Sequence, residues 1–294
     1  MAPDLRHSNV DVAVIGSATL DRIVFEDQSV EKIGGVSVYA GLTFRKHGLE
    51  TAVLANIAGA DLRHFRPLEE SGVRLEAGPT AATTRFVNRE TAGGRIQEMP
   101  AAADPIRSVG ALSAMHSVRH IHLGPLHPDD IHPDLLSRVK LGRYFVSLDV
   151  QGFVRIVRNG AVAAGVCERL EEVLSFVDVV KASEEELGLI LERFGMDAPT
   201  LQARFGFGEL LVTCGAGGGR LINTAGATFD YAPVRTGRVE DPTGAGDVFF
   251  AAYLAGRHHE GWTEREALGH AAQAASLHVE GKYIPKSVLE IHAE

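Results

Sequence analysis

The sequence has little cysteine and no long hydrophobic run. Its 294 residues include two cysteines, Cys167 and Cys214, which are too few for a disulfide framework and fit a reducing compartment. The apolar run that ends at Ile15 is interrupted by Asp11 and is too short for a signal peptide. No other stretch approaches the roughly 18 apolar residues that cross a bilayer. We therefore expect a globular, cytoplasmic protein with no membrane partner.

Basic residues are also in the minority. Lysine and arginine total 29 against 38 aspartates and glutamates, which gives a net charge of −9. Nucleic acids and anionic lipid surfaces both require a basic face, so this balance argues against a nucleic-acid partner. Hydrophobic residues make up 45% of the chain, which excludes disorder of the chain as a whole. A chain of this length buries about 75% of its unfolded surface, so it needs no disulfide or metal to fold.

Short β-branched runs alternate with longer helical patterns, as expected for strand-helix-strand units on a mostly parallel sheet. The apolar runs that qualify as buried strands are Val10–Ile15, Thr51–Ile57, His120–Leu123, Tyr144–Asp149, Val177–Lys181 and Glu209–Thr213. Helices are predicted over Val36–His47, Pro133–Leu141, Glu168–Phe176, Ser183–Phe194, Ala245–His258 and Thr263–Glu280. No repeat or linker divides the chain. The fold class is therefore α/β, and residues 1–294 are expected to form a single domain.

One region breaks this alternation. Thr83–Arg89 and Arg95–Met99 are strand-like, and they flank the turn Thr91-Ala92-Gly93-Gly94, whose glycines supply the positive φ angles of a hairpin. A second extended segment, Asp21–Ile33, follows the first strand. We interpret both as antiparallel parts of a small, discontinuous β lid covering approximately residues 20–34 and 83–99. Two ordinary surface hairpins are the alternative.

Two common phosphate-binding fingerprints are absent. The chain contains no G-x-x-x-x-G-K-[ST] sequence. The run Gly215-Ala216-Gly217-Gly218-Gly219-Arg220 does not satisfy G-x-G-x-x-G, because Arg220 stands at the last glycine position. The sequence therefore predicts neither a P-loop enzyme nor an obvious dinucleotide-binding protein.

The segment Asp241-Pro242-Thr243-Gly244-Ala245-Gly246-Asp247 runs directly into the apolar helix that begins at Val248. Backbone N–H groups at a helix N-terminus have no acceptor within the helix, and the helix dipole is positive there, so they can hold an anion without lysine. Asp247 places a carboxylate in the same turn, where it can accept a proton from an attacking hydroxyl group. An ordinary helix start with an acidic residue in its first turn is the alternative.

The run DPTGAGD at residues 241–247 resembles the C-terminal signature of the ribokinase-like (PfkB) family of carbohydrate kinases. Further motifs occur in the family's order: Gly16–Asp21 resembles its first strand, Gly34-Gly35 its N-terminal signature, and Val212–Gly218 its V-T-x-G-x-x-G nucleotide segment. The resemblance implies a three-layer α/β/α fold with a β lid. It also implies transfer of a phosphoryl group from ATP, with Mg²⁺, to a hydroxyl group.

The same resemblance assigns roles to individual positions. Asp247 corresponds to the catalytic base, and Gly244, Ala245 and Gly246 correspond to the anion hole. Asp21, Gly34, Gly35 and Tyr39 fall at substrate positions, and a carboxylate such as Asp21 can accept hydrogen bonds from neighbouring sugar hydroxyls. Thr213, Gly215 and Gly218 fall at nucleotide positions. A solvated turn aspartate and a plain Gly-Gly turn are the alternatives for Asp21 and for Gly34-Gly35.

Lys181-Ala182-Ser183-Glu184-Glu185-Glu186 resembles the family's N-x-x-E motif, with Ser183 where asparagine is usual. The resemblance assigns Lys181, Ser183 and Glu186 to the cofactor site, with Glu186 acting on Mg²⁺ through a bound water. S-x-x-E at a helix start is equally the pattern of a capping box, which alone explains both Ser183 and Glu186. Asp241 and Thr243 match positions that bind a monovalent cation such as K⁺ in some members.

The acceptor is expected to be a neutral sugar or cyclic polyol. Asp149 and Gln151 lie in a D-x-Q-x-x-x-R segment that, together with Tyr39, is most similar to the inositol-kinase-like subgroup, which makes myo-inositol the leading substrate. A cyclic polyol carries hydroxyl groups and no charge, so a pocket of carboxylates and amides suits it. Another sugar or a nucleoside is the alternative within the family.

Two alternatives belong to other classes of protein. His120 and His122 alternate with apolar residues and would lie on one strand face, which together with His127 and His132 is a pattern compatible with a metal-dependent hydrolase. A non-catalytic ligand sensor on the same fold is the other alternative. The exposed edge of the lid is also a surface through which two copies of the chain could pair as a homodimer.

Overall fold

The main sheet of the protein has nine strands in the order β15-β14-β13-β12-β9-β8-β1-β4-β5. The computed structural model describes residues 9–25, 28–91, 94–107, 109–115 and 117–291. The strands from β13 to β5 run parallel to one another, and β14 and β15 extend one edge antiparallel. The strands are β1 (Val12–Ile15), β4 (Thr51–Asn56), β5 (Arg74–Gly78), β8 (His120–Leu123), β9 (Phe145–Asp149), β12 (Val179–Ser183), β13 (Glu209–Thr213), β14 (Gly219–Asn223) and β15 (Thr228–Tyr231).

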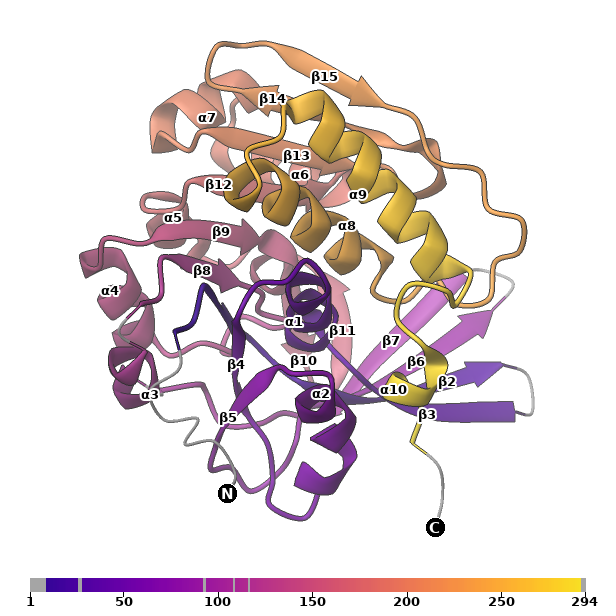
Figure 1. The fold of residues 1–294 in the computed structure, drawn as a ribbon. Helices are drawn as coiled ribbons and strands as arrows, with labels where there is room; N and C mark the ends of the chain where they lie inside the picture. Colours follow the sequence, from indigo (N-terminus) through magenta and orange to yellow (C-terminus); the bar gives the residue numbers. More distant parts are fainter. Residues whose placement is uncertain (1–8, 26–27, 92–93, 108, 116, 292–294) are drawn as a thin grey trace.

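Helices cover both faces of this sheet, and alternate strand residues face the two helical layers. Val12 and Val14 of β1 join one hydrophobic cluster, whereas Ala13 and Ile15 join the other. The first cluster includes residues of α1 (Val36–Lys46), α2 (Arg66–Glu70), α8 (Ala245–Leu254), α9 (Glu264–Val279) and α10 (Lys286–Leu289). The second includes residues of α3 (Val109–Ala114), α4 (Pro133–Leu141), α5 (Leu170–Leu174), α6 (Glu184–Phe194) and α7 (Ala198–Phe205) (Figure 1). The predicted three-layer α/β/α architecture is confirmed.

Most predicted elements occur where the apolar pattern placed them. The bounds of β8, α4 and β13 are those expected, and the other predicted elements differ by a few residues at their ends. The largest difference is in the helix predicted over Ala245–His258. It is α-helical to Leu254 and continues as a π-helical turn over Ala255–His259. A π turn differs from the α-helix in its hydrogen-bond register, which a 3.6-residue hydrophobic pattern does not reveal.

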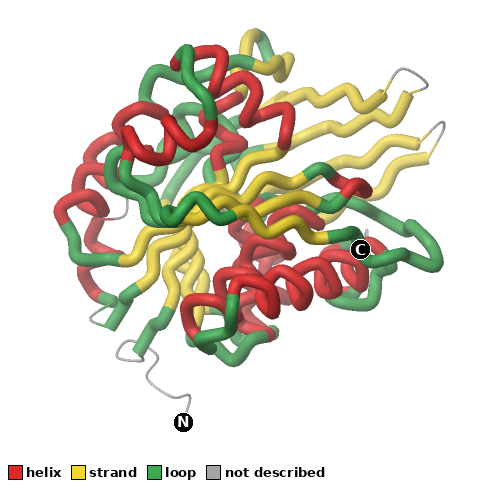
Figure 2. Tube along the Cα trace, turned by 90° about the horizontal axis from the view of Figure 1, so that it is seen from above, coloured by secondary structure: helices red, strands yellow, loops and turns green. Residues whose placement is uncertain are grey.

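A second sheet of six strands, in the order β10-β11-β7-β6-β2-β3, projects from one side of the α/β body (Figure 1), and Figure 2 shows it from above. Its strands are β2 (Thr19–Phe25), β3 (Gln28–Gly34), β6 (Arg85–Thr91), β7 (Gly94–Ala101), β10 (Arg155–Arg158) and β11 (Ala161–Ala164). We call it the lid sheet. Both segments interpreted as a lid lie in it, although Ala92 and Gly93 of the predicted turn fall outside the described residues.

The lid sheet differs from the expectation in two respects. β10 and β11, which were not predicted, complete one edge of it. In addition, β2 and β6 pair parallel, with Asp21 opposite Phe86, so the expectation of purely antiparallel pairing was wrong. β2 leaves the main sheet directly after β1, and β6 enters from the loop after β5, so both strands run outward from the body.

A buried aspartate holds together the loops beneath the junction of the two sheets. Asp130 accepts hydrogen bonds from the backbone N–H and the hydroxyl of Ser17 (3.1 and 2.6 Å) and from the backbone N–H of Leu126 (2.8 Å). These contacts fix the segments that follow β1 and β8, at the carboxyl ends of parallel strands where α/β proteins place ligands. Within the described part of the chain, no helix has the length and apolar character to cross a membrane.

Candidate active site

Two cavities meet at the N-terminus of α8. The first, with a volume of about 100 Å³, is lined at this point by Gly244 and Asp247, and we call it the acceptor cavity. The second, of about 740 Å³, is lined by Pro242, Ala245 and Gly246, and we call it the donor cavity. The first turn of one helix therefore forms a wall of both cavities.

The helix start exposes unpaired backbone donors to these cavities. Gly244 is the N-cap residue with φ of 81°, a left-handed conformation that favours glycine. The N–H of Ala245 donates to the carbonyl of Pro242 (3.2 Å), so this anion-hole residue is engaged in a turn. The N–H groups of Gly244, Gly246 and Asp247 have no acceptor among the residues that the structure describes. The arrangement can bind an anion, with Asp247 rather than Ala245 as the third donor.

The Asp247 carboxyl group faces the acceptor cavity in a poorly solvated position. Burial raises its pKa to about 7, with a further contribution from the negative charge of Asp149. The positive charges of Lys181 and Arg155 oppose this shift. A carboxyl group whose pKa lies near neutrality can both exist as the carboxylate and hold a proton, which is what a general base requires.

A buried ion pair lies behind Asp247. Lys181 Nζ donates to Asp149 Oδ2 at 2.8 Å, and the two side chains are 6% and 0% exposed. Burial alone would lower the pKa of Lys181, but Asp149 and then Glu186 reverse the shift and raise it. A Cβ atom built on Gly246 would lie 3.4 Å from Lys181 Nζ. The ammonium group therefore lies close to Gly246 in the first turn of α8, and Lys181 lines neither cavity.

The predicted substrate residues occupy different positions around the acceptor cavity. Asp21, Gly35, Tyr39 and Gln151 line it. Gly34 lies behind Asp21, and a Cβ atom there would come within 2.3 Å of Asp21 Oδ2, so this glycine leaves room for the carboxylate. Asp149 does not line the cavity. Its Oδ1 accepts a hydrogen bond from the backbone N–H of Gln151 (3.1 Å), so it orients the residue that does.

Three strands of the lid sheet, β6, β7 and β10, contribute lining residues of the acceptor cavity that sequence reasoning did not assign. Asn88 and Gln97 stand opposite each other in the register of β6 and β7, and Gln97 Nε2 donates to Asn88 Oδ1 at 2.8 Å. The sequence contains a signal for Asn88. Phe86 and Asn88 both line the cavity, and because they are two residues apart in a strand, their side chains share one face. Arg155, which ends the D-x-Q-x-x-x-R segment, donates to the carbonyl of Leu126 (3.2 Å). All of these residues line the acceptor cavity.

The donor cavity has mainly apolar walls. Thr213, Gly215 and Gly218 line it, as their motif implies for nucleotide residues. Arg235 is the one arginine or lysine in the described lining. The remaining wall residues are mostly apolar or small and come from the 3-10 turn after β13, β15, the segment before α8, and the helices α8 and α9: Ala216, Tyr231, Pro233, Val234, Thr236, Val239, Pro242, Ala245, Gly246, Phe249, Ala272, Ala275, Ser276 and Val279.

Ser183 and Glu186 form a capping box at the start of α6. Ser183 N–H donates to Glu186 Oε2 (2.7 Å), and Glu186 N–H donates to Ser183 Oγ (3.1 Å). Neither residue lines the donor cavity. The cap uses one oxygen of Glu186 and leaves Oε1 for a metal-bound water. The residues present therefore fit Mg²⁺ held mainly by substrate phosphates and water, with one carboxylate nearby.

Asp241 and Thr243, the residues predicted to bind a monovalent cation, are both engaged with nitrogen donors. Asp241 forms an ion pair with Lys32 of β3. Burial acts to raise the pKa of Asp241, but the charge of Lys32 outweighs it and lowers the pKa below its usual range. The carbonyl oxygen of Thr243 accepts a hydrogen bond from His278 Nε2 at 2.9 Å.

The paired histidines of β8 are core residues. His120 Nε2 and His122 Nδ1 both hydrogen-bond to Ser147 Oγ (2.7 and 2.9 Å), and both rings contact Phe44 edge to face. Burial lowers the pKa of His122 to about 4, so it is neutral at physiological pH. Within the described ranges, no group of three or more histidine, cysteine or acidic side chains is arranged to hold a metal ion. The alternation of His120 and His122 with apolar residues therefore reflects the packing of β8 in the core.

Comparisons with known proteins agree with this geometry. Residues 73–287 match the pfkB family of carbohydrate kinases. Cytidine kinase from Thermococcus kodakarensis is 24% identical over 254 residues, which cover 84% of this chain and 88% of that protein. Among solved structures, a pyrophosphate-dependent kinase in the ribokinase family, complexed with a pyrophosphate analog and myo-inositol, aligns with a TM-score of 0.80 and 24% identity over 92% of this chain and 95% of that chain. Arabidopsis thaliana ribokinase, complexed with ribose and ATP, aligns with a TM-score of 0.70 and 21% identity over 96% of this chain and 98% of that chain. The predicted ribokinase-type fold is confirmed.

Proposed function

The chain belongs to the pfkB family of carbohydrate kinases, and on this basis we propose that it transfers the γ-phosphoryl group of ATP to a hydroxyl group of a small neutral acceptor. The observation that carries the proposal is the position of the α8 N-terminus between two cavities. Asp247 faces the smaller cavity, and Ala245 and Gly246 face the larger one. A donor and an acceptor bound on the two sides would meet at the unpaired N–H groups.

In the proposed reaction, an acceptor hydroxyl group attacks the γ-phosphorus and passes its proton to the carboxylate of Asp247. The bond from the γ-phosphorus to the bridging oxygen breaks, and ADP leaves with the electron pair. The N–H groups of Gly246 and Asp247 would stabilise the charge on the transferring group. Mg²⁺ neutralises phosphate charge when it is bound with the nucleotide, and Glu186 would hold it through a water molecule.

The lining of the acceptor cavity favours a neutral, hydroxyl-rich ring. Asp21, Asn88, Gln97 and Gln151 supply carboxylate and amide groups that hydrogen-bond to hydroxyls without requiring a charged ligand. The volume of about 100 Å³ suits a single ring. A cyclic polyol such as myo-inositol, the compound bound in one solved neighbour, is the leading candidate.

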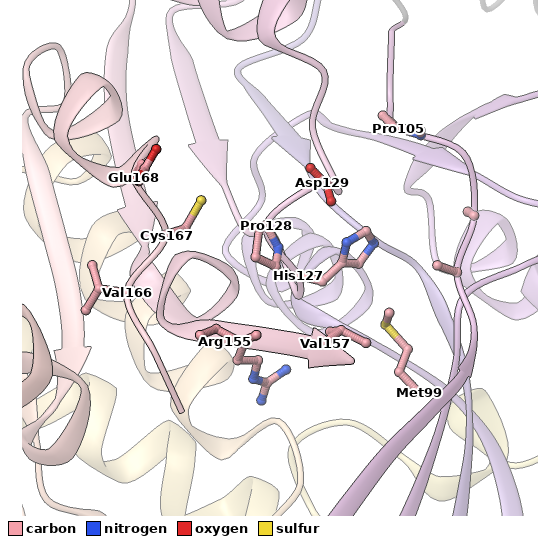
Figure 3. A pocket seen from close by; sticks show the side chains of 13 residues that line it. Met99, Pro105, His127, Pro128, Asp129, Arg155, Val157, Val166, Cys167 and Glu168 are labelled. Carbon is pink, nitrogen blue, oxygen red and sulfur yellow. The ribbon is translucent and has the colours of Figure 1, made fainter. Parts of the chain in front are cut away.

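A nucleoside is the second candidate, and a neighbouring cavity favours it. A cavity of about 470 Å³ shares Arg155 with the acceptor cavity. In Figure 3, Cys167 and Glu168 lie on one side of this cavity, and His127 and Asp129 lie on the other. A nucleoside with its ribose beside Asp247 could extend past Arg155 and place its base there. The cytidine kinase named among the relatives is consistent with this mode of binding.

The donor cavity favours a nucleotide over pyrophosphate, although one solved neighbour is pyrophosphate-dependent. Pyrophosphate has no apolar part, and its charge would call for several basic side chains. The described lining instead offers one arginine and extended apolar walls from Val234, Val239 and Phe249. Such walls suit the flat face of a nucleobase.

We expect phosphorylation of myo-inositol with MgATP, and no more than a trace with magnesium pyrophosphate. The measurement is product formation over a panel of myo-inositol, ribose, fructose and cytidine with each donor. Preferred turnover of cytidine would select the nucleoside alternative. Turnover with pyrophosphate but not ATP would contradict the assignment of the donor cavity. ADP release with no phosphorylated product from any acceptor would contradict the proposed kinase function.

The raised pKa of Asp247 predicts the pH dependence of the reaction. The carboxylate is the active form, so kcat/KM should fall about tenfold per unit as the pH drops below about 7 and should reach a plateau above it. Lys181 favours the carboxylate, and its removal in Lys181→Met should move the acid limb to higher pH. The measurement is kcat/KM across the pH range in both proteins. A flat wild-type profile, or a limb that moves to lower pH in the variant, would be incompatible with Asp247 as the base.

A further inference from the structure

The oxygen atoms assigned to a monovalent cation already have partners. Asp241 Oδ2 is paired with Lys32 Nζ, and its Oδ1 accepts the N–H of Thr243 at 2.9 Å. The Thr243 carbonyl accepts a hydrogen bond from His278 Nε2 at 2.9 Å. A bound K⁺ ion requires several such oxygens to replace its hydration shell. These residues therefore do not fit a resident K⁺ ion, because nitrogen donors occupy its ligands.

Lys32 is buried to an extent that is unusual for lysine. It lies on β3 of the lid sheet directly across from Asp21, and its side chain is 4% exposed. Its Nζ atom lies 5.9 Å from the centroid of the Tyr39 ring. A buried lysine costs several kcal/mol unless it is paired. Among the residues that the structure describes, Asp241 is the ion-pair partner of Lys32, so this contact accounts for the position of the ammonium group.

The ammonium group is connected to the helix start through a short turn. Asp241 fixes the N–H of Thr243, and His278 fixes its carbonyl, so both backbone groups of the residue before Gly244 are held. The direction of the turn from Asp241 to Gly244 determines where the N–H groups of α8 point. Lys32 places a positive charge beside the Asp241 carboxylate that receives the Thr243 N–H, and it does so from a strand more than two hundred residues away in the sequence.

We propose that the ammonium group of Lys32 is a built-in replacement for the monovalent cation, a positioning residue that holds the Asp241–Gly244 turn and makes phosphoryl transfer independent of K⁺. The inference rests on the proposed function. It also assigns Lys32 a second effect, since the same contact ties β3 of the lid sheet to the loop that carries the catalytic turn.

The first test is the cation dependence of the wild-type protein. With myo-inositol, ribose and cytidine as acceptors, KCl should leave kcat unchanged relative to tetramethylammonium chloride at equal ionic strength. Stimulation by K⁺ of about tenfold or more would overturn the inference. In Lys32→Ala we expect kcat to fall about 10- to 100-fold in tetramethylammonium chloride, and K⁺ or ammonium to restore a large part of it. Tetramethylammonium is larger than K⁺ or ammonium and has no N–H group to donate to Asp241, so it serves as the reference cation. A folded Lys32→Ala protein with unchanged kcat, or with no response to K⁺, would also overturn it.

Lys286→Ala is the matched control. Lys286 pairs at 2.8 Å with Glu240, the residue next to Asp241, and its side chain is 52% exposed. Loss of this exposed pair should change neither kcat nor its response to K⁺. A K⁺-dependent Lys286→Ala protein would show that any lost lysine near this turn has the same effect, which contradicts a specific role for Lys32.

Thermal unfolding provides a second readout that needs no acceptor. A ligand that binds the folded state raises the unfolding temperature. KCl should therefore stabilise Lys32→Ala more than tetramethylammonium chloride does, and should have no specific effect on the wild type. The inference would be contradicted if K⁺ specifically stabilised the wild type. It would also be contradicted if K⁺ specifically stabilised neither protein. If no acceptor is phosphorylated, the proposed function fails, and the unfolding measurement still decides the role of Lys32.

Discussion

Replacing Asp247 by asparagine should lower kcat by about 10²- to 10⁴-fold and leave the dissociation constant for MgATP close to that of the wild type. The amide cannot accept the proton of the attacking hydroxyl group, but it has the same shape and leaves the N–H groups of α8 in place. The measurements are steady-state kinetics and direct titration with MgATP. A variant with near wild-type kcat would remove Asp247 from the role of base.

The stability of the same variant provides a check on its folding. The pKa of Asp247 is raised in the folded protein, so folding disfavours the carboxylate, and the wild type loses stability as the pH rises through about 7. Asparagine has no charge to bury, so Asp247→Asn should unfold at the same or a higher temperature than the wild type at pH 8. Asp134→Asn is the control, because the Asp134 side chain is 78% exposed on α4 and touches neither cavity. It should leave kcat unchanged.

The parts of the fold that were predictable are those whose local pattern and tertiary environment agree. β8 and β13 are almost entirely buried. Leu210–Val212 form a continuous apolar run in β13, whereas Ile121 and Leu123 of β8 alternate with two buried histidines. β10 and β11 are different, because they are short and partly exposed, and neither Arg-Ile-Val-Arg nor Ala-Val-Ala-Ala alternates between apolar and polar residues. They become strands through pairing with each other and with β7, which no local pattern reveals.

The candidate site divides in the same way. Residues whose predicted role depends on backbone geometry, such as Gly244 and Gly246, belong to one contiguous motif, and both line the cavities at the start of α8. Side chains that act through distant partners could not be placed. Asp149 was expected to face the substrate, but it pairs with Lys181 across neighbouring strands, and Lys32 meets Asp241 from another sheet. These pairings depend on strand order, which a single sequence does not specify.

Gly244→Ala should reduce kcat by about 10²- to 10³-fold, the effect of losing one well-placed anion donor. Two features oppose any side chain here. The φ angle of 81° is left-handed and costs an L-residue about 1–2 kcal/mol. In addition, a Cβ atom would lie 2.6 Å from three carbon atoms of the Tyr39 ring, which is 1% exposed and belongs to the hydrophobic core. The turn must therefore shift, and the N–H groups of the first turn would no longer point at the phosphoryl group.

Gly206→Ala separates the two effects. Gly206 also has a left-handed φ of 78°, but a Cβ atom there would have no heavy atom within 4 Å. It ends α7, on the other face of the sheet. The control should therefore lose stability comparable to the conformational strain in Gly244→Ala and keep its kcat. Equal kcat in both variants would show that the position of the α8 turn is not critical. A large loss confined to Gly244→Ala would link catalysis to the contact between this turn and Tyr39, which supports it from the acceptor side.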